Sequence, residues 1–295
     1  MLRLAFSTVA TPDWTLPRVV EAAAQYGYDG VELRSMGRGG AELACEPALT
    51  DGAKVRRLFA DAGLTPSGVA SGCTFDAPVN PPVMGELLKP HEKIIANAKQ
   101  YIDIAHEIGA SYARVYAFKI PNGERRHRTL TRIARRLAAV CTHARHRNVS
   151  VVIENGGDFS SASDLAEIIN VVGSPYLMAL YDLEAGMAVG DQPRDAVRLL
   201  GRKLIAARIK DSLHGRPCAL GKGSLPCREL IRAMREANSS AWLVYTWDRA
   251  WLSHLAPSEE MLPHAARQLA EWASAGGSGG VGSGAASGRS LVGAA

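Results

Sequence analysis

Short aliphatic and β-branched runs alternate with helical patterns along most of the chain. Runs with the length and composition of buried strands span residues 2–7, 30–34, 65–71, 112–117, 150–154, 176–182, 204–211 and 241–246. The spacing of apolar residues predicts helices near 16–26, 51–62, 86–108, 127–147, 163–172, 192–201, 227–237 and 258–273. Ser163 and Ser258 stand at N-cap positions, and Gly27, Gly63 and Gly109 stand where helices should end.

Eight strand–helix pairs in this order predict a single-domain α/β protein, a (β/α)8 TIM barrel over residues 1–273. The competing fold, a doubly wound sheet, normally carries a glycine fingerprint after its first strand, and LAFSTVATPDW has none. From Ser274 onward the sequence is rich in Gly, Ser and Ala and offers little to bury. We therefore expect residues 274–295 to form a flexible, disordered tail without catalytic groups.

Cysteine usage and hydropathy narrow the class of protein. The 295 residues include five widely spaced cysteines and no CxxC pair, which argues against a disulfide framework or a zinc knuckle. The sequence has no signal-peptide pattern and no run of about 18 apolar residues that could cross a bilayer. We therefore expect a cytoplasmic protein with no membrane partner.

The net charge of +5 has a local origin. Residues 124–147 contain eight arginines and a single acid, Glu124. Apolar residues in this segment follow helical spacing, so we expect the arginines to line the outward, solvated face of a helix. An anionic partner is the alternative interpretation of this face, but nucleic acid is not expected.

Polar residues stand at the predicted strand ends, where TIM barrels carry their chemistry. They are Glu32, Arg34, Ser71, Arg114, Tyr116, Glu154, Asp182, Arg208, Lys210 and Thr246. Residues two apart share a strand face, so Arg208 and Lys210 should point the same way. Glu154 and Asp182 each end a long apolar run, and burying a carboxylate there is costly unless it meets a cation or a metal.

Four segments carry a family resemblance: PDWTLPRVVEAAAQYGYDGVELR, VVIENGGDFSSASDL, RIKDS with ALGKGSLP, and WDRAWLSHLAPSEEMLPHAARQLAEW. In these segments the chain resembles the sugar phosphate isomerase/epimerase family, the xylose-isomerase-like barrels that include tagatose epimerases and, more distantly, apurinic endonucleases. The resemblance implies one divalent cation held by Glu, Asp, His and Glu at the ends of strands five to eight. Glu154 and Asp182 match the first two ligands.

The remaining ligand positions depart from the family pattern. The histidine position holds Arg208, and the last acid position holds Thr246. Two further histidine positions hold Gly156 and Ala185. The resemblance therefore implies the family fold with a degenerate metal site, and these losses argue against a multi-zinc repair nuclease.

Arg208 cannot be a metal ligand, because its guanidinium stays protonated and has no lone pair to donate. We hypothesise that it replaces the cation, pairing with Glu154 or Asp182 or orienting a negative group of a ligand. A purely structural ion pair is the alternative. No cofactor is expected, although the sequence leaves room for Mg²⁺ or Mn²⁺ between the two acids.

The resemblance and these residues together suggest an isomerase- or epimerase-like enzyme that transfers protons on a polyhydroxylated or keto small molecule without the family metal. Glu154, Asp182 and Arg208 would be catalytic, and the predicted substrate-binding residues are Glu32, Arg34, Arg114, Tyr116, Lys210 and Thr246. The alternatives are a lyase, dehydratase or cyclase of specialised metabolism on this scaffold, and a non-catalytic binding barrel. The substrate could be neutral or anionic, and homo-oligomerisation stays open.

One further motif, Gly221-Lys222-Gly223, could present amides and an ammonium group to a phosphate. Without a surrounding nucleotide-binding pattern, a simple turn is the stronger interpretation.

Overall fold

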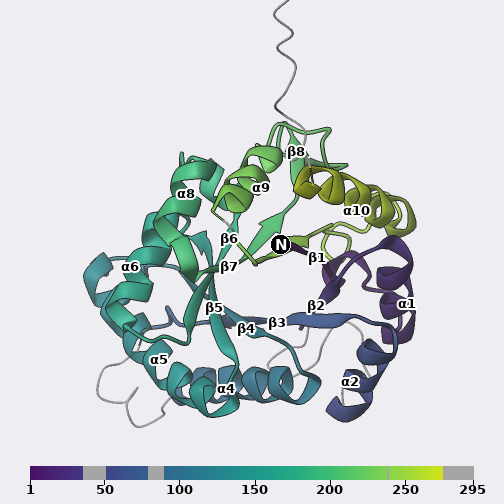
Figure 1. Ribbon diagram of the computed structural model, residues 1–295. Coiled ribbons are helices and arrows are strands. Elements are labelled where there is room, and N and C mark those ends of the chain that lie inside the picture. The colour runs from purple at the N-terminus through teal and green to yellow at the C-terminus, as the bar shows by residue number, and fades with distance from the viewer. Residues whose placement is uncertain (36–50, 79–89, 238, 275–295) are drawn as a thin grey trace, which may run out of the picture.

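Eight parallel strands close into a barrel surrounded by helices in the computed structural model, which describes residues 1–35, 51–78, 90–237 and 239–274 (Figure 1). The barrel strands are β1 (Arg3–Ser7), β2 (Gly30–Arg34), β3 (Thr65–Thr74), β4 (Tyr112–Phe118), β5 (Ser150–Gly157), β6 (Leu177–Asp182), β7 (Leu204–Ile209) and β10 (Trp242–Tyr245). Their order around the barrel is β1-β10-β7-β6-β5-β4-β3-β2. The TIM-barrel prediction is confirmed.

The helices follow the strands along the chain. They are α1 (Leu16–Tyr26), α2 (Gly52–Asp61), α4 (Pro90–Ile108), α5 (Arg126–Arg147), α6 (Ala162–Val172), α7 (Leu183–Ala188), α8 (Pro193–Leu200), α9 (Cys227–Glu236) and α10 (Ser258–Ser274). Two 3-10 turns, η1 (Thr8–Ala10) and η3 (Gly201–Lys203), and a small hairpin of β8 (Asp211–Leu213) and β9 (Arg216–Cys218) complete the described elements. The sequence pattern predicted neither α7 nor the hairpin. The predicted tail, 274–295, begins one residue too early, because Ser274 ends α10, and residues 275–295 lie outside the described residues.

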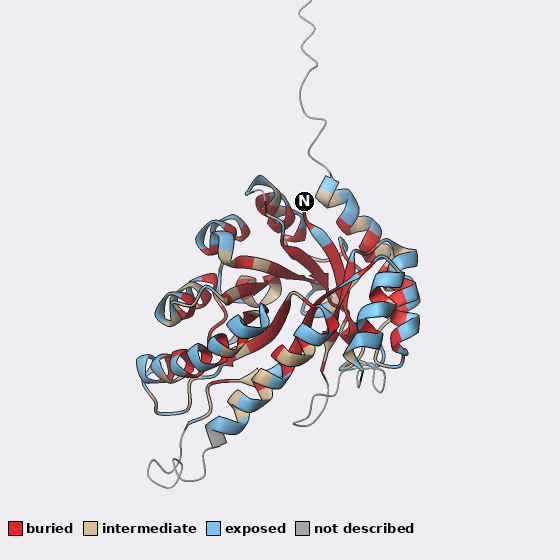
Figure 2. Cartoon of the chain, turned by 60° about the horizontal axis from the view of Figure 1, so that its bottom comes forward, coloured by how far each residue is buried: buried red, intermediate tan, exposed pale blue. Residues whose placement is uncertain are grey.

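Two cores hold the barrel together. The larger one lies between the outward faces of the strands and the buried faces of the helices (Figure 2). The smaller one fills the barrel interior with Ala5, Tyr112, Val152, Leu180, Ala206, Trp242 and Val244. No helix within the described ranges combines the length and apolarity that a bilayer span requires.

Glycines make room for the two large rings of the inner core. A Cβ on Gly68 would lie 2.1 Å from the Tyr112 ring, and one on Gly30 would lie 2.9 Å from the Trp242 ring. Real Cβ atoms do not approach other atoms so closely, so a side chain at either glycine would displace its ring. The glycines thus allow two aromatic rings to fill the interior below the barrel mouth.

Of the five residues predicted at helix ends, the three glycines are right and the two serines are wrong. Gly27, Gly63 and Gly109 all adopt positive φ at or just after the ends of their helices, as expected of glycine terminators. The N-cap of α6 is Ser161, however, and the predicted Ser163 lies inside the helix. Ser258 is likewise the first residue of α10 itself, and its hydroxyl donates to the Ala10 carbonyl. Ser161 forms a capping box with Asp164, whose backbone N–H donates to the serine while its carboxylate accepts from the Ser161 N–H. Asp164, three residues after Ser161, completes this pair of hydrogen bonds, which is why Ser161 rather than Ser163 is the N-cap.

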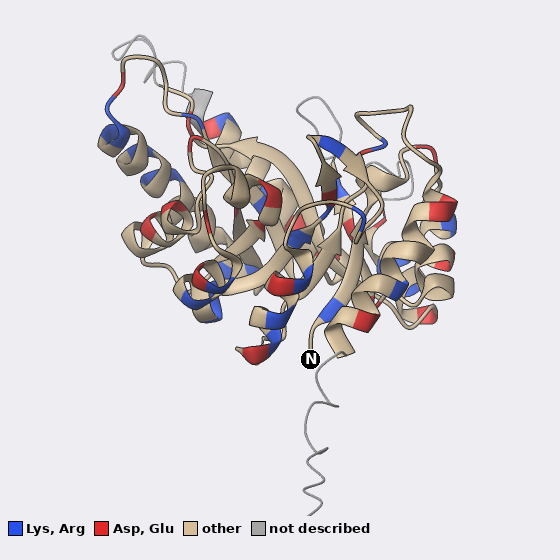
Figure 3. Ribbon diagram, turned by 90° about the horizontal axis from the view of Figure 1, so that it is seen from above, with Lys and Arg blue, Asp and Glu red and all other residues tan. Residues whose placement is uncertain are grey.

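The arginine-rich helix α5 differs from its prediction in one residue. Arg136 is 2% exposed and donates hydrogen bonds of 2.7 Å to the carbonyls of Phe75 and Ala77. The expectation that every arginine of 124–147 faces solvent is therefore wrong for Arg136, which ties the end of β3 to α5. Acidic and basic residues are interspersed around the ring of helices (Figure 3), and Arg126, for example, pairs with Asp164.

The loop after β7 is fixed by one buried carboxylate. Asp211 accepts hydrogen bonds of 2.9 Å from the N–H groups of Gly221 and Gly223, and it also accepts from Ser212 and Leu225. The amides that could have bound a phosphate are therefore already paired. These contacts favour the turn interpretation of the Gly221-Lys222-Gly223 motif.

Candidate functional site

The carboxyl ends of the strands bring the predicted polar residues to one mouth of the barrel. On β7 the small Ala206 belongs to the inner core, so Arg208, two residues later, also points inward. The strand register places Arg208 beside Asp182 of β6 on one side and beside Val244 of β10 on the other. Thr246, two residues after Val244, follows the end of β10.

Arg208 forms the centre of a buried ion-pair cluster. Its Nε lies 2.7 Å from Oε1 of Glu154, and its Nη2 lies 3.0 Å from Oε2, a bidentate pair. Its Nη1 donates to Oγ1 of Thr246 at 2.8 Å and to Oε1 of Glu32 at 3.2 Å, and its Nη2 reaches Oε2 of Glu32 at 3.4 Å. Arg208, Glu154, Glu32 and Thr246 are called the Arg208 cluster below.

The Arg208 cluster is saturated. A guanidinium has five N–H donors, and the five contacts of Arg208 use all of them. Arg208 is 5% exposed, Glu154 is 3% exposed and Glu32 is fully buried. Of the two partners that the sequence suggested, Glu154 pairs with Arg208, whereas the second partner is Glu32 of β2 rather than Asp182. Arg208 therefore has no free donor for a ligand.

The charges of the cluster reinforce one another. Burial alone would raise the pKa of Glu154, but Arg114 and Arg208 outweigh it and lower the pKa to about 2. Burial likewise works against the Arg208 guanidinium, but Glu154 and Glu32 hold its pKa well above the usual value. Glu154 is thus ionised throughout the physiological pH range and is a weak base.

Two further arginines line the β2–β4 side of the mouth. The Nε of Arg114 lies 3.0 Å from Oε2 of Glu154, and its guanidinium stacks 4.3 Å from the Tyr116 ring centroid. Its Nη1 is buried and has no hydrogen-bond partner among the described residues. Arg34 donates to the Ser71 carbonyl at 2.6 Å and makes no ion pair in the described part of the chain. Burial, with Arg114 next, lowers the pKa of Arg34 to about 10.

On the β6–β7 side, a second and more open group of charges surrounds Lys210. Its Nζ lies 2.7 Å from Oε2 of Glu184 and 3.8 Å from Oδ2 of Asp182. The side chains of Asp182, Lys210 and Glu184 are 10%, 23% and 38% exposed, so all three are more accessible than the Arg208 cluster. Lys210, Asp182 and Glu184 are called the Lys210 cluster.

The Lys210 cluster contains the group best suited to exchange a proton. Burial raises the pKa of Asp182, Glu154 adds to that rise, and Lys210 only partly opposes it. Burial disfavours the Lys210 ammonium, but Asp182 and Glu184 outweigh burial and raise the pKa of Lys210. The cluster therefore joins an acid with a raised pKa to an ammonium whose pKa is also raised, an arrangement typical of proton-transfer sites.

Three residues of the site were missed by sequence reasoning. Tyr112 donates from its hydroxyl to Oε2 of Glu32 at 3.0 Å and so fixes that carboxylate. The side chain of Asn155 accepts from the Asp182 N–H at 2.6 Å and donates to the Asp182 carbonyl at 3.0 Å. Glu184 pairs with Lys210. Asn155, a polar residue within a buried strand, carried a detectable pattern, whereas the other two depend on contacts distant in sequence.

The donor set does not fit the divalent cation that the resemblance implies. Both oxygens of Glu154 accept from Arg208, and the guanidinium lies where the third ligand would be. A divalent metal ion 4 Å from this positive charge would be repelled by about 8 kcal/mol at an effective dielectric constant of 20. Within the described ranges, no group of three or more His, Cys, Asp or Glu side chains is placed to hold a metal.

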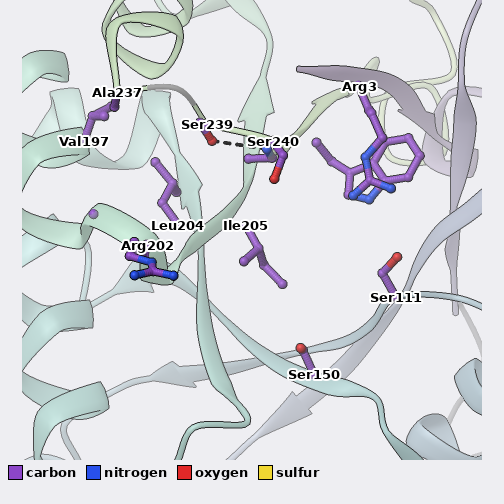
Figure 4. Close-up of a pocket in the computed structure, with 13 residues that line it drawn as sticks. Arg3, Ser111, Ser150, Val197, Arg202, Leu204, Ile205, Ala237, Ser239 and Ser240 are labelled. Atoms are coloured by element: carbon purple, nitrogen blue, oxygen red, sulfur yellow. Dashed lines mark hydrogen bonds between the residues drawn. The ribbon is translucent and has the colours of Figure 1, made fainter. Parts of the chain in front are cut away.

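A separate cavity of about 460 Å³ lies at the opposite end of the barrel, where the strands begin (Figure 4). It is lined by Arg3, Ser150 and Trp242 among others and shares no residue with the mouth. Catalytic residues of TIM barrels come from the carboxyl ends of the strands, so the mouth, rather than this cavity, is the candidate active site.

Comparisons with known proteins agree with the fold. A family model described as xylose isomerase-like TIM barrel matches residues 20–272. A search among curated proteins finds no match. Among solved structures, the D-allulose 3-epimerase from Methylomonas sp. is 15% identical, with a TM-score of 0.71 over 92% of this chain and 98% of the epimerase.

Two other solved structures show how varied the similar barrels are. The IolI protein, solved with a bound zinc atom, is 16% identical, with a TM-score of 0.77 over 92% of this chain and 98% of IolI. A "probable 3-DHS dehydratase", AsbF from Bacillus anthracis, is 14% identical, with a TM-score of 0.73 over 91% of this chain and 99% of AsbF. Identities this low show a shared fold and nothing finer.

Proposed function

Because the chain belongs to the xylose isomerase-like TIM barrel family, we propose that it is an isomerase- or epimerase-like enzyme that works without a divalent metal. Its substrate is a polyhydroxylated or keto small molecule, and its chemistry is proton transfer next to a carbonyl. The observation that carries the metal-free part is the bidentate pair of Arg208 and Glu154 at the position of the family ligands.

Asp182 is the proposed proton-transfer group. Its raised pKa makes it a stronger base than an ordinary aspartate once it is ionised, and its side chain reaches the mouth. Glu154, with a pKa of about 2 and both oxygens paired, is less suited to this role. The contacts therefore favour Asp182 as the base, with Glu154 as the residue that holds Arg208 and Arg114.

Lys210 is the proposed stabiliser of negative charge on the reacting oxygen. Its ammonium lies 3.8 Å from Asp182, so a carbonyl oxygen beside Lys210 would put the neighbouring C–H within reach of the aspartate. Taking a proton from that carbon places negative charge on the oxygen, which an ammonium stabilises. Family enzymes assign this role to the metal, and here a cationic side chain takes it.

Arg34, Arg114 and Tyr116 form the opposite wall of the proposed substrate site. Arg34 has no carboxylate partner among the described residues and Arg114 has an unpaired Nη1, so this wall is more cationic than the Lys210 side. It suits a carboxylate, a phosphate or several hydroxyls of the substrate. Arg208, whose donors are all used, acts here as a positioning residue that stands in for the ion.

The test is solvent deuterium incorporation into D-fructose and D-allulose, the sugars present in two similar solved structures. We expect carbon-bound deuterium next to the carbonyl, an unchanged rate with EDTA, and a loss of at least about 100-fold in Asp182→Asn. The matched control is Asp195→Asn, which changes an exposed aspartate paired with Arg198. If EDTA abolished the deuterium exchange, the proposal that the enzyme works without a divalent metal would be wrong.

A second candidate, a non-catalytic binding barrel, is favoured by one observation, the saturation of the Arg208 cluster. Sugars that bind in calorimetry but show neither exchange nor conversion would favour it. A dehydratase or lyase would use the same proton-transfer groups, and loss of water or cleavage in product NMR would identify it. The similar fold of AsbF makes this the first alternative reaction to examine.

A further inference from the structure

The cavity at the amino-terminal end of the barrel brings together side chains that the proposed reaction does not use. It is formed by the starts of β1, β5, β7 and β10, by Ser111 just before β4, and by the turn η3. Figure 4 shows Arg3 on one side, Arg202 on the other, and Ile205 between them. A volume of about 460 Å³ is in the range of small-molecule sites, roughly 300–1,000 Å³.

Three side-chain donors of this cavity, on Arg3, Arg202 and Trp242, have no protein partner among the described residues. The guanidinium of Arg3 stacks 4.0 Å from the centroid of the Trp242 ring, which holds it face-on and leaves its N–H edge free. Neither Arg3 nor Arg202 makes an ion pair or a side-chain hydrogen bond within the described part of the chain. The indole Nε1 of Trp242 is buried and has no acceptor there.

The lining has almost no competing negative charge. Its thirteen residues include no Asp or Glu, and the hydroxyls of Ser111 and Ser150 add further donors at the bases of two adjacent strands. Asp29 lies near Arg3 and offsets part of its charge, but its carboxylate accepts from the Leu4 N–H and does not line the cavity. Helix C-termini gather at this end of a barrel and disfavour anions, so the arginines must supply the attraction.

The rest of the lining is apolar. Leu204, Ile205 and the Trp242 ring contribute hydrophobic surface beside the donors. We infer that this cavity binds a small organic anion, in which a carboxylate or phosphate meets Arg3, Ser111 and Ser150 while a compact apolar body contacts Ile205 and Trp242. The site lies at the opposite end of the barrel from the mouth and does not depend on the proposed function.

The experiment is titration calorimetry of the full chain with three probes: benzoate, inorganic phosphate and benzyl alcohol. We expect benzoate to bind one site, phosphate to bind it at least threefold more weakly, and the uncharged alcohol not to bind. Arg3→Gln should weaken benzoate at least tenfold. Ser150→Ala should weaken it by a few fold while leaving Arg3 in place.

The matched control is Arg145→Gln, which removes an exposed arginine of α5 that has no partner within the described ranges. Its benzoate affinity should stay within twofold of the parent. The inference is overturned if benzoate does not bind, if Arg3→Gln and Ser150→Ala bind it like the parent, or if Arg145→Gln loses as much affinity as Arg3→Gln. Tighter binding of phosphate than of benzoate would overturn the apolar part of the ligand. If Arg3→Gln does not fold, the benzoate affinity of Ser150→Ala alone tests the inference.

Discussion

Two clusters of charge are built around residues only two apart, Arg208 in β7 and Lys210 just after its end, yet they differ in almost every physical respect. The Arg208 cluster is buried, and all five N–H donors of its guanidinium form hydrogen bonds with protein acceptors. The Lys210 cluster is partly exposed and contains one short contact, to Glu184, and one longer contact, to Asp182. One cluster is built to stay unchanged, and the other can exchange partners and protons.

Depth in the barrel explains the difference. Deep in the mouth, each charge must be fully paired, because water cannot replace a missing partner. Closer to the rim, water screens the charges, so an incomplete pair such as Lys210 and Asp182 is tolerated. A permanent cation at the deeper level also sets the pKa values of the acids around it. The barrel thus separates a structural charge on β7 from a reactive one just beyond the end of that strand.

Removing the cation should give the largest effect. Arg208→Leu leaves Glu154 and Glu32 buried without their main partner and should lower the free energy of unfolding by about 3–5 kcal/mol. Lys210→Leu, at a partly exposed position, should cost about 1 kcal/mol or less. Urea unfolding of both variants measures the contrast, and equal costs would contradict the distinction between the clusters.

Acid should weaken the Arg208 cluster selectively. A carboxyl pKa held near 2 instead of 4.5 corresponds to about 3 kcal/mol, at about 1.4 kcal/mol per pKa unit. Because the folded-state pKa is depressed, this stability is present above pH 4.5 and is lost as the pH falls toward 2. The unfolding free energy of the parent should therefore fall more steeply between pH 5 and 2 than that of Glu154→Gln. Parallel curves would show that Glu154 is not held ionised by its arginines.

Exchanging the guanidinium for a ligand should convert one cluster into a metal site. The double substitution Arg208→His and Thr246→Glu, together with Glu154 and Asp182, supplies the four ligands of the family pattern. We expect it to bind Mn²⁺ in calorimetry and to gain about 2.7 kcal/mol of stability at a metal concentration 100 times Kd. The parent, with its arginine in place, should bind none. Stoichiometric Mn²⁺ in the parent would refute the substitution of a guanidinium for the ion.

Local rules were sufficient for much of this picture. The alternation of strand-like and helix-like hydrophobic patterns along the chain predicted the barrel. The two-residue periodicity of strands, together with the positions of the strand ends, placed Arg208, Glu154 and Asp182 at its mouth. The chemistry of a guanidinium by itself excludes Arg208 as a metal ligand. These conclusions depend only on neighbours along the chain and on the nature of the side chain.

Tertiary structure decided which groups meet. The second partner of Arg208 is Glu32, 176 residues away on a strand that becomes close only when the barrel closes. When the barrel closes, Asp182 lies beside Lys210 instead of pairing with Arg208. The packing of α5 against the loop after β3 buries Arg136, which the helical periodicity had predicted to face solvent. Sequence pattern fixes the face on which a side chain stands. The partner that the side chain meets depends on distances across the barrel, which local sequence periodicity does not determine. Its pKa depends on that partner and is therefore also decided by the tertiary structure.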